Sequence, residues 1–178
     1  MEKKIANLSA LLIINGIIAL LFGVFALFVP QETAKSIAVY FGFILLLGGL
    51  IGMYVSIKNM QQGKNWLFNV FGSLLGILVG IFIVIYTRRS IEIFAIIMGI
   101  WAIILGAVQL ILFFNLQKNA DNKRWFLFSS ILPIVFGLIL FFNPFESIVA
   151  ILVIVGILAL IFGFVLVYLG LAVRKDKD

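Results

Sequence analysis

The sequence predicts an all-α integral membrane protein with six transmembrane helices, arranged as three helical hairpins that are parallel copies of one repeat. Three observations lead to this prediction: an extreme composition, six long uncharged segments and an internal period. Hydrophobic residues make up 65% of the 178 positions and charged residues only 11%, whereas a soluble domain has roughly 45–50% apolar and about 25% charged residues. Such an apolar surface requires lipid as its solvent, and we expect one membrane domain over residues 1–178.

The uncharged segments have the length of membrane-spanning helices. A helix of about 20 residues crosses the hydrocarbon core of a bilayer, which is roughly 30 Å thick. Strands are excluded because an open sheet leaves unpaired backbone groups in lipid, and the first segment is too long for a cleaved signal, whose apolar region has about 7–15 residues. The six predicted spans are 5–31, 36–57, 65–87, 93–117, 125–145 and 147–173.

The basic residues predict the orientation of these spans. Six spans place both termini and the second and fourth loops on the same side of the membrane. That side carries ten basic residues and the other side three, and basic residues favour the cytoplasm. Both termini are therefore predicted to be cytoplasmic. The ten are Lys3, Lys4, Lys58, Lys64, Lys118, Lys123, Arg124, Arg174, Lys175 and Lys177, and the three are Lys35, Arg88 and Arg89.

A gapless period of 57 residues divides the chain into three repeats, approximately 5–58, 65–117 and 123–173. In three columns of this alignment every copy has glycine, which permits close approach of membrane helices. Because each repeat contains two spans, the copies have one orientation, and we expect a pseudo-threefold arrangement about the membrane normal. The columns are Gly23, Gly80 and Gly137, then Gly42, Gly99 and Gly156, then Gly49, Gly106 and Gly163.

Further glycines form GxxxG steps in the second and third spans. Gly48 with Gly52 makes one step, and Gly72, Gly76 and Gly80 make two overlapping steps. Steps of this kind occur where membrane helices pack closely. Two uses remain open, packing inside the chain and dimerisation.

Two aligned columns predict the turn inside each hairpin. Proline disfavours helix in the residue before it and lacks a backbone donor, so it ends the first helix. The hydroxyl residue that follows is expected to accept a hydrogen bond from free backbone amides and so to start the second helix. The columns are Pro30, Thr87 and Pro144, and then Thr33, Ser90 and Ser147.

The residue types exclude most catalytic chemistry. The chain has no Cys and no His, which removes thiol nucleophiles, disulfides and histidine acid–base catalysis or metal ligation. No ionisable residue lies in mid-span, where such residues mark ion paths or proton relays, and no phosphate-binding loop or nucleophile motif is present. We therefore expect no enzyme, no cofactor and no metal. The net charge of +6 is scattered through the loops, which does not indicate nucleic-acid binding.

Two weaker patterns involve polar residues. Asn15, Ser73 and Ser130 lie within spans at nearly equivalent repeat positions, and they either form interhelical hydrogen bonds or line a path for a small solute. At the outer turns, Glu32, Arg89 and Glu146 share one column. They form either a charge cluster, in which Arg89 bridges two carboxylates, or a solvated rim of little energetic weight.

Three segments carry a family resemblance. Residues 16–30 (GIIALLFGVFALFVP), 130–144 (SILPIVFGLILFFNP) and 147–163 (SIVAILVIVGILALIFG) resemble the HdeD-like family, acid-resistance membrane proteins built from a short repeat of unknown function. The middle repeat departs from the pattern, because Thr87 replaces the turn proline and two arginines follow it. The resemblance implies a bacterial cytoplasmic membrane protein that contributes to acid or envelope stress tolerance, and it supplies no catalytic residues.

Two functions are compatible with these observations. The first is a non-enzymatic multi-pass membrane protein that acts through the lipid bilayer, a membrane-protein partner or a second copy of itself. The alternative is a small-solute channel or transporter with a polar path between the hairpins.

Overall fold

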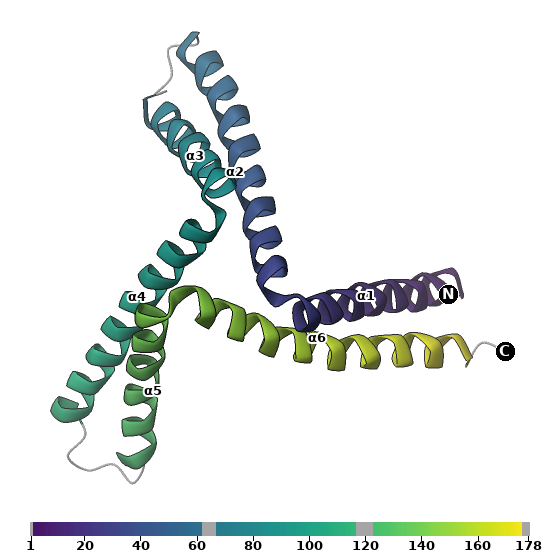
Figure 1. Cartoon of the computed structure of the whole chain (residues 1–178). Coiled ribbons are helices and arrows are strands. Elements are labelled where there is room, and N and C mark those ends of the chain that lie inside the picture. Colours follow the sequence, from purple (N-terminus) through teal and green to yellow (C-terminus); the bar gives the residue numbers. More distant parts are fainter. Residues whose placement is uncertain (1, 62–66, 117–122, 176–178) are drawn as a thin grey trace. The chain divides into compact units, whose positions relative to one another are not determined.

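The computed structural model describes residues 2–61, 67–116 and 123–175, and in these ranges every element is an α-helix (Figure 1). The all-helical class predicted from the sequence is confirmed. The calls on residues 62–66 and 117–122, the second and fourth loops, lie outside the described residues. The six helices are α1 (Glu2–Phe28), α2 (Pro30–Gln61), α3 (Leu67–Ile85), α4 (Thr87–Leu116), α5 (Lys123–Phe142) and α6 (Pro144–Lys175).

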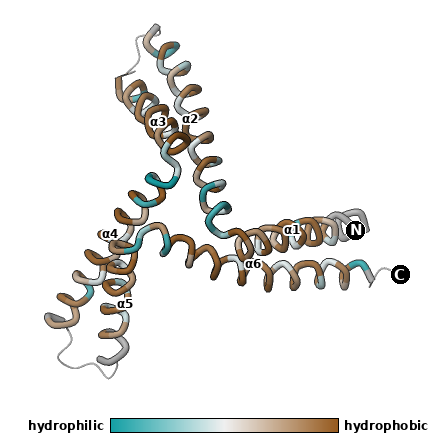
Figure 2. Tube along the Cα trace, viewed as in Figure 1, coloured by the Kyte–Doolittle hydropathy of each residue, from teal (hydrophilic) through white to brown (hydrophobic). Residues whose placement is uncertain are grey.

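The helices have the length and surface of membrane spans. Within the described residues, five helices contain an apolar stretch long enough to cross a bilayer, and α5 contains a shorter one, Leu127–Phe142. Large apolar side chains remain exposed along these helices, as at Phe28 (80% exposed) and Phe68 (86% exposed). Figure 2 shows hydrophobic residues along the helices and hydrophilic residues gathered towards their ends. Since water does not tolerate such a surface, the surroundings are a lipid bilayer.

The chain divides into two compact units, each described here by itself. The first unit comprises Met1–Ala34 and Val149–Asp178, and in it α1 packs antiparallel to α6. The second unit, Lys35–Ile148, contains two antiparallel helix pairs, α2 with α3 and α4 with α5. The single membrane domain over 1–178 stays a prediction, as does the pseudo-threefold arrangement.

The middle repeat does not form the hairpin predicted for it. Helix α4 packs along α5, whereas α3 and α4 contact one another only to a small extent (Figure 1). The reason lies in the connection, because Tyr86 alone separates α3 from α4 and an antiparallel helix pair requires a loop of about 2–5 residues. Backbone hydrogen bonds even continue through the junction, from Tyr86 N to Phe82 O (2.8 Å) and from Ser90 N to Tyr86 O (2.9 Å).

The hydroxyl residues after each junction act differently from the prediction. The Thr33 hydroxyl donates to Val29 O (2.9 Å) and Phe25 O (3.1 Å), and the Ser147 hydroxyl donates to carbonyls at the end of α5. Helices α2, α4 and α6 begin earlier, at the column of Pro30 itself, because proline suits the first position of a helix. The hydroxyls instead pair with carbonyl groups of the preceding turn, as lipid surroundings require.

Candidate functional site

The nine glycines of the three repeat columns are all buried, and each lies where two helices meet. In the α2–α3 pair, a methyl group added to Gly80 would lie 2.9 Å from Gly42 O. The equivalent distance is 2.5 Å between Gly137 and Gly99 O in the α4–α5 pair, and 2.8 Å between Gly23 and Gly156 O in the α1–α6 pair. Backbones at these separations leave no room for any side chain, so glycine is required there.

A second contact repeats in the same register about two turns away. An added methyl group would lie 2.8 Å from Ser73 O at Gly49, 2.8 Å from Ser130 O at Gly106, and 2.9 Å from Gly163 O at Gly16. Shifting the α2–α3 contacts by 57 residues reproduces the α4–α5 contacts. A further shift reaches α6 and returns to the first repeat at α1. One antiparallel interface is therefore used three times, and its order of pairing closes on itself.

The three polar residues proposed to line a solute path sit in different surroundings. Asn15 is exposed on α1, and its side-chain amide donates to Leu11 O of its own helix (2.9 Å). Ser73 is buried between α3 and α2, where its hydroxyl donates to Asn69 O (2.6 Å). Ser130 is fully buried between α5 and α4. The two serines thus lie in separate helix pairs, each packed against a glycine of the partner helix.

The outer charge column has a local partner that sequence reasoning did not select. Arg89 Nη1 lies 3.0 Å from Glu92 Oε2, and Arg88 Nε lies 3.1 Å from Glu92 Oε1. The guanidinium of Arg88 also stacks 4.6 Å from the ring centroid of the buried Phe145. The spacing of three and four residues on one helix was the available signal. In the second unit the carboxylate that binds Arg89 is therefore that of Glu92, while Glu146 is exposed.

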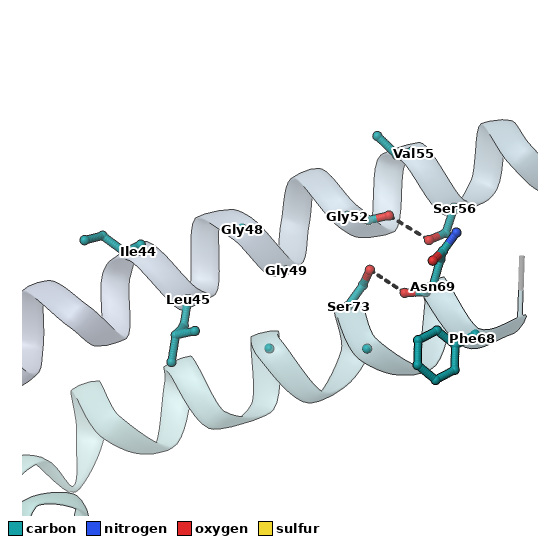
Figure 3. A pocket seen from close by; sticks show the side chains of 12 residues that line it. Ile44, Leu45, Gly48, Gly49, Gly52, Val55, Ser56, Phe68, Asn69 and Ser73 are labelled. Atoms are coloured by element: carbon teal, nitrogen blue, oxygen red, sulfur yellow. Dashed lines mark hydrogen bonds between the residues drawn. The ribbon is translucent and has the colours of Figure 1, made fainter.

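The α2–α3 pair contains an open groove with a volume of about 700 Å³ (Figure 3). Its floor consists of backbone, because glycines occupy that face on both helices. Polar groups of Ser56, Asn69 and Ser73 gather at the end nearest the start of α3 (Figure 3). The glycines are Gly48, Gly49 and Gly52 of α2 and Gly72 and Gly76 of α3.

The glycines of the GxxxG steps do not all serve internal packing. Gly76 approaches Gly49, and Gly52 approaches Ser73, but a methyl group added at Gly48 or Gly72 would meet nothing within 4 Å. Sequence reasoning missed the groove because packed and open glycines look identical in a sequence. Among the described residues, no three side chains of metal-ligating type lie together.

One family model matches the chain three times, and its description is a short repeat of unknown function (DUF308). The matches cover residues 14–85, 71–142 and 128–178. Their starting points are 57 residues apart, which is the period found in the sequence, and the resemblance stated from the sequence is confirmed. No match was found among the curated proteins, and none among the solved structures.

Proposed function

Because this chain belongs to the DUF308 short-repeat family, we propose that it is a non-enzymatic protein of the bacterial cytoplasmic membrane that contributes to acid or envelope stress tolerance. Both termini lie in the cytoplasm in this proposal. The protein acts by organising lipid or by binding a membrane-protein partner or a second copy, and it moves no solute itself.

The observation that carries this proposal is the glycine-sealed interface of each helix pair. A solute path between two helices needs space, and backbone contacts at the glycine columns leave none. The hydroxyls of Ser56 and Ser73 bond to carbonyls of their own helices, so neither is needed to pair with a passing solute. Proton relays through membranes use acidic or histidine side chains, and the sequence has no histidine and no acidic residue in mid-span.

A transport assay separates this proposal from the channel or transporter alternative. The purified full chain is placed in liposomes that hold a pH-sensitive dye, and a proton gradient is imposed. We expect the gradient to decay as slowly as in protein-free liposomes. Faster decay that is slowed by Ser73→Val or Ser130→Val would favour the alternative and overturn the proposal.

A genetic assay tests the stress role. Deleting the gene should lower survival after an acid challenge, and the intact gene supplied in trans should restore it. Survival equal to that of the parent strain under acid and under envelope-damaging detergent would contradict the proposed role. The two assays are independent, since a protein without transport activity can still protect the cell.

A further inference from the structure

We propose that the α2–α3 groove binds one acyl chain of a membrane phospholipid, with the polar part of the lipid at Asn69. The groove belongs to a helix pair whose two members both qualify as membrane spans, so its open side faces hydrocarbon. Its volume of about 700 Å³ falls within the roughly 300–1,000 Å³ of small-molecule sites.

The internal repeat shows that the groove is a departure from a common pattern. Gly48 of α2 corresponds to Leu105 and Phe162 in the equivalent helices, and Gly72 of α3 corresponds to Asn15 and Ser129. The other two pairs therefore carry side chains at both positions, whereas the α2–α3 pair has none. Because an added methyl group would meet nothing at Gly48 or Gly72, close helix packing does not account for these two glycines.

The length of the groove matches one leaflet. Its lining runs from Ser56 to Ile44 on α2, which is about 18 Å, and from Asn69 to Gly76 on α3, about 10 Å, at 1.5 Å per residue. These lengths are near half of the roughly 30 Å hydrocarbon core. A docked helix from a second copy would contact the pair across the whole core, so a groove that ends near mid-membrane fits an acyl chain better.

The polar end lies where a lipid head group would be. Asn69 is the third residue of α3, close to the membrane surface, and its side chain is exposed. Within the part of the chain that the structure describes, the Asn69 side-chain amide has no hydrogen-bonding partner, whereas Ser56 and Ser73 are satisfied by their own helices. An amide can bond to ester or phosphate oxygens.

Photo-crosslinking of the full chain in liposomes tests the proposal. The liposomes contain phosphatidylcholine, with a rising fraction of phosphatidylcholine that carries a diazirine in one acyl chain. We expect labelling of Ile44, Val55 and Phe68 in the groove to saturate at a low fraction. Labelling of Ile97 and Trp101, apolar and exposed on α4, should instead rise in proportion to the fraction.

A filled groove provides the matched variant. The double substitution Gly48→Leu and Gly72→Leu should reduce the saturable labelling by about tenfold or more, equivalent to about 1.4 kcal/mol of binding free energy. The control Ala10→Leu adds the same side chain at an exposed position of α1 and should leave labelling unchanged. Proportional labelling at every exposed residue would overturn the proposal. Protection of the groove from labelling would do so too, because it would show a protein segment bound there.

Discussion

Replacing Gly80 by alanine should weaken the α2–α3 interface. The added methyl group would lie 2.8 Å from Leu46 N and 2.9 Å from Gly42 O. Both are backbone atoms, which cannot rotate away. Ordinary van der Waals contact begins at 3.4 Å, so the helices must separate by at least about 0.6 Å at this point. Overpacking of this kind typically costs about 1–3 kcal/mol.

A matched substitution on the same helix separates packing from helix propensity. Gly72→Ala makes the same chemical change in α3, but its methyl group meets nothing within 4 Å. Both variants gain the same preference of alanine for helix, up to about 1 kcal/mol. Any difference between the two variants therefore measures the crowding at Gly80.

The assay is the free energy of unfolding of the full chain, measured by titration with a denaturing detergent in mixed micelles. We expect Gly80→Ala to be less stable than Gly72→Ala by about 1–3 kcal/mol, and Gly72→Ala to be at least as stable as the wild type. Equal stability of the two variants would refute the argument that backbone contact at the glycine columns holds the helices together.

Three further predictions concern the junctions, the orientation and the pairing order. Ser147→Ala removes a hydroxyl that donates to two carbonyls and should lower the same unfolding free energy by about 1 kcal/mol; an unchanged value would show that other groups satisfy those carbonyls. Single cysteines at Asn119, which lies outside the described residues, and at Glu146 should label oppositely in intact cells, with only the second accessible from outside; labelling at Asn119 alone would reverse the orientation. A circular permutant with joined termini and a new opening within 117–122 should unfold at the same detergent concentration as the wild type, because the α1–α6 register repeats that of the other pairs; failure to fold would contradict the equivalence of the pairs.

The number and kind of helices were accessible from sequence because they depend on local and compositional terms. A run of about 20 apolar residues must satisfy its backbone internally in lipid, and a helix does this without reference to any partner. The period of 57 residues was likewise visible, since it needs only self-comparison. The glycine columns followed from it, and so did the suggestion that close helix contacts occur there.

The choice of partner for each helix was not accessible in the same way. A buried glycine such as Gly99 favours close approach of some helix, but the preference is the same for α3 and α5. The decision came from connection lengths, because one residue between α3 and α4 does not reverse the chain. Sequence reasoning expected a proline turn at that point, and the helical hydrogen bonds that pass through the junction replaced it.

The sequence by itself determined an apolar, six-helix, three-repeat membrane protein with glycine at fixed repeat positions. Only the tertiary structure decided that Gly49 is covered by the backbone of α3 while the adjacent Gly48 faces an open groove. Consecutive residues of a helix point about 100° apart, so their surroundings depend on which helix lies opposite and on its register. That information arises from contacts between distant segments, which composition and periodicity do not contain.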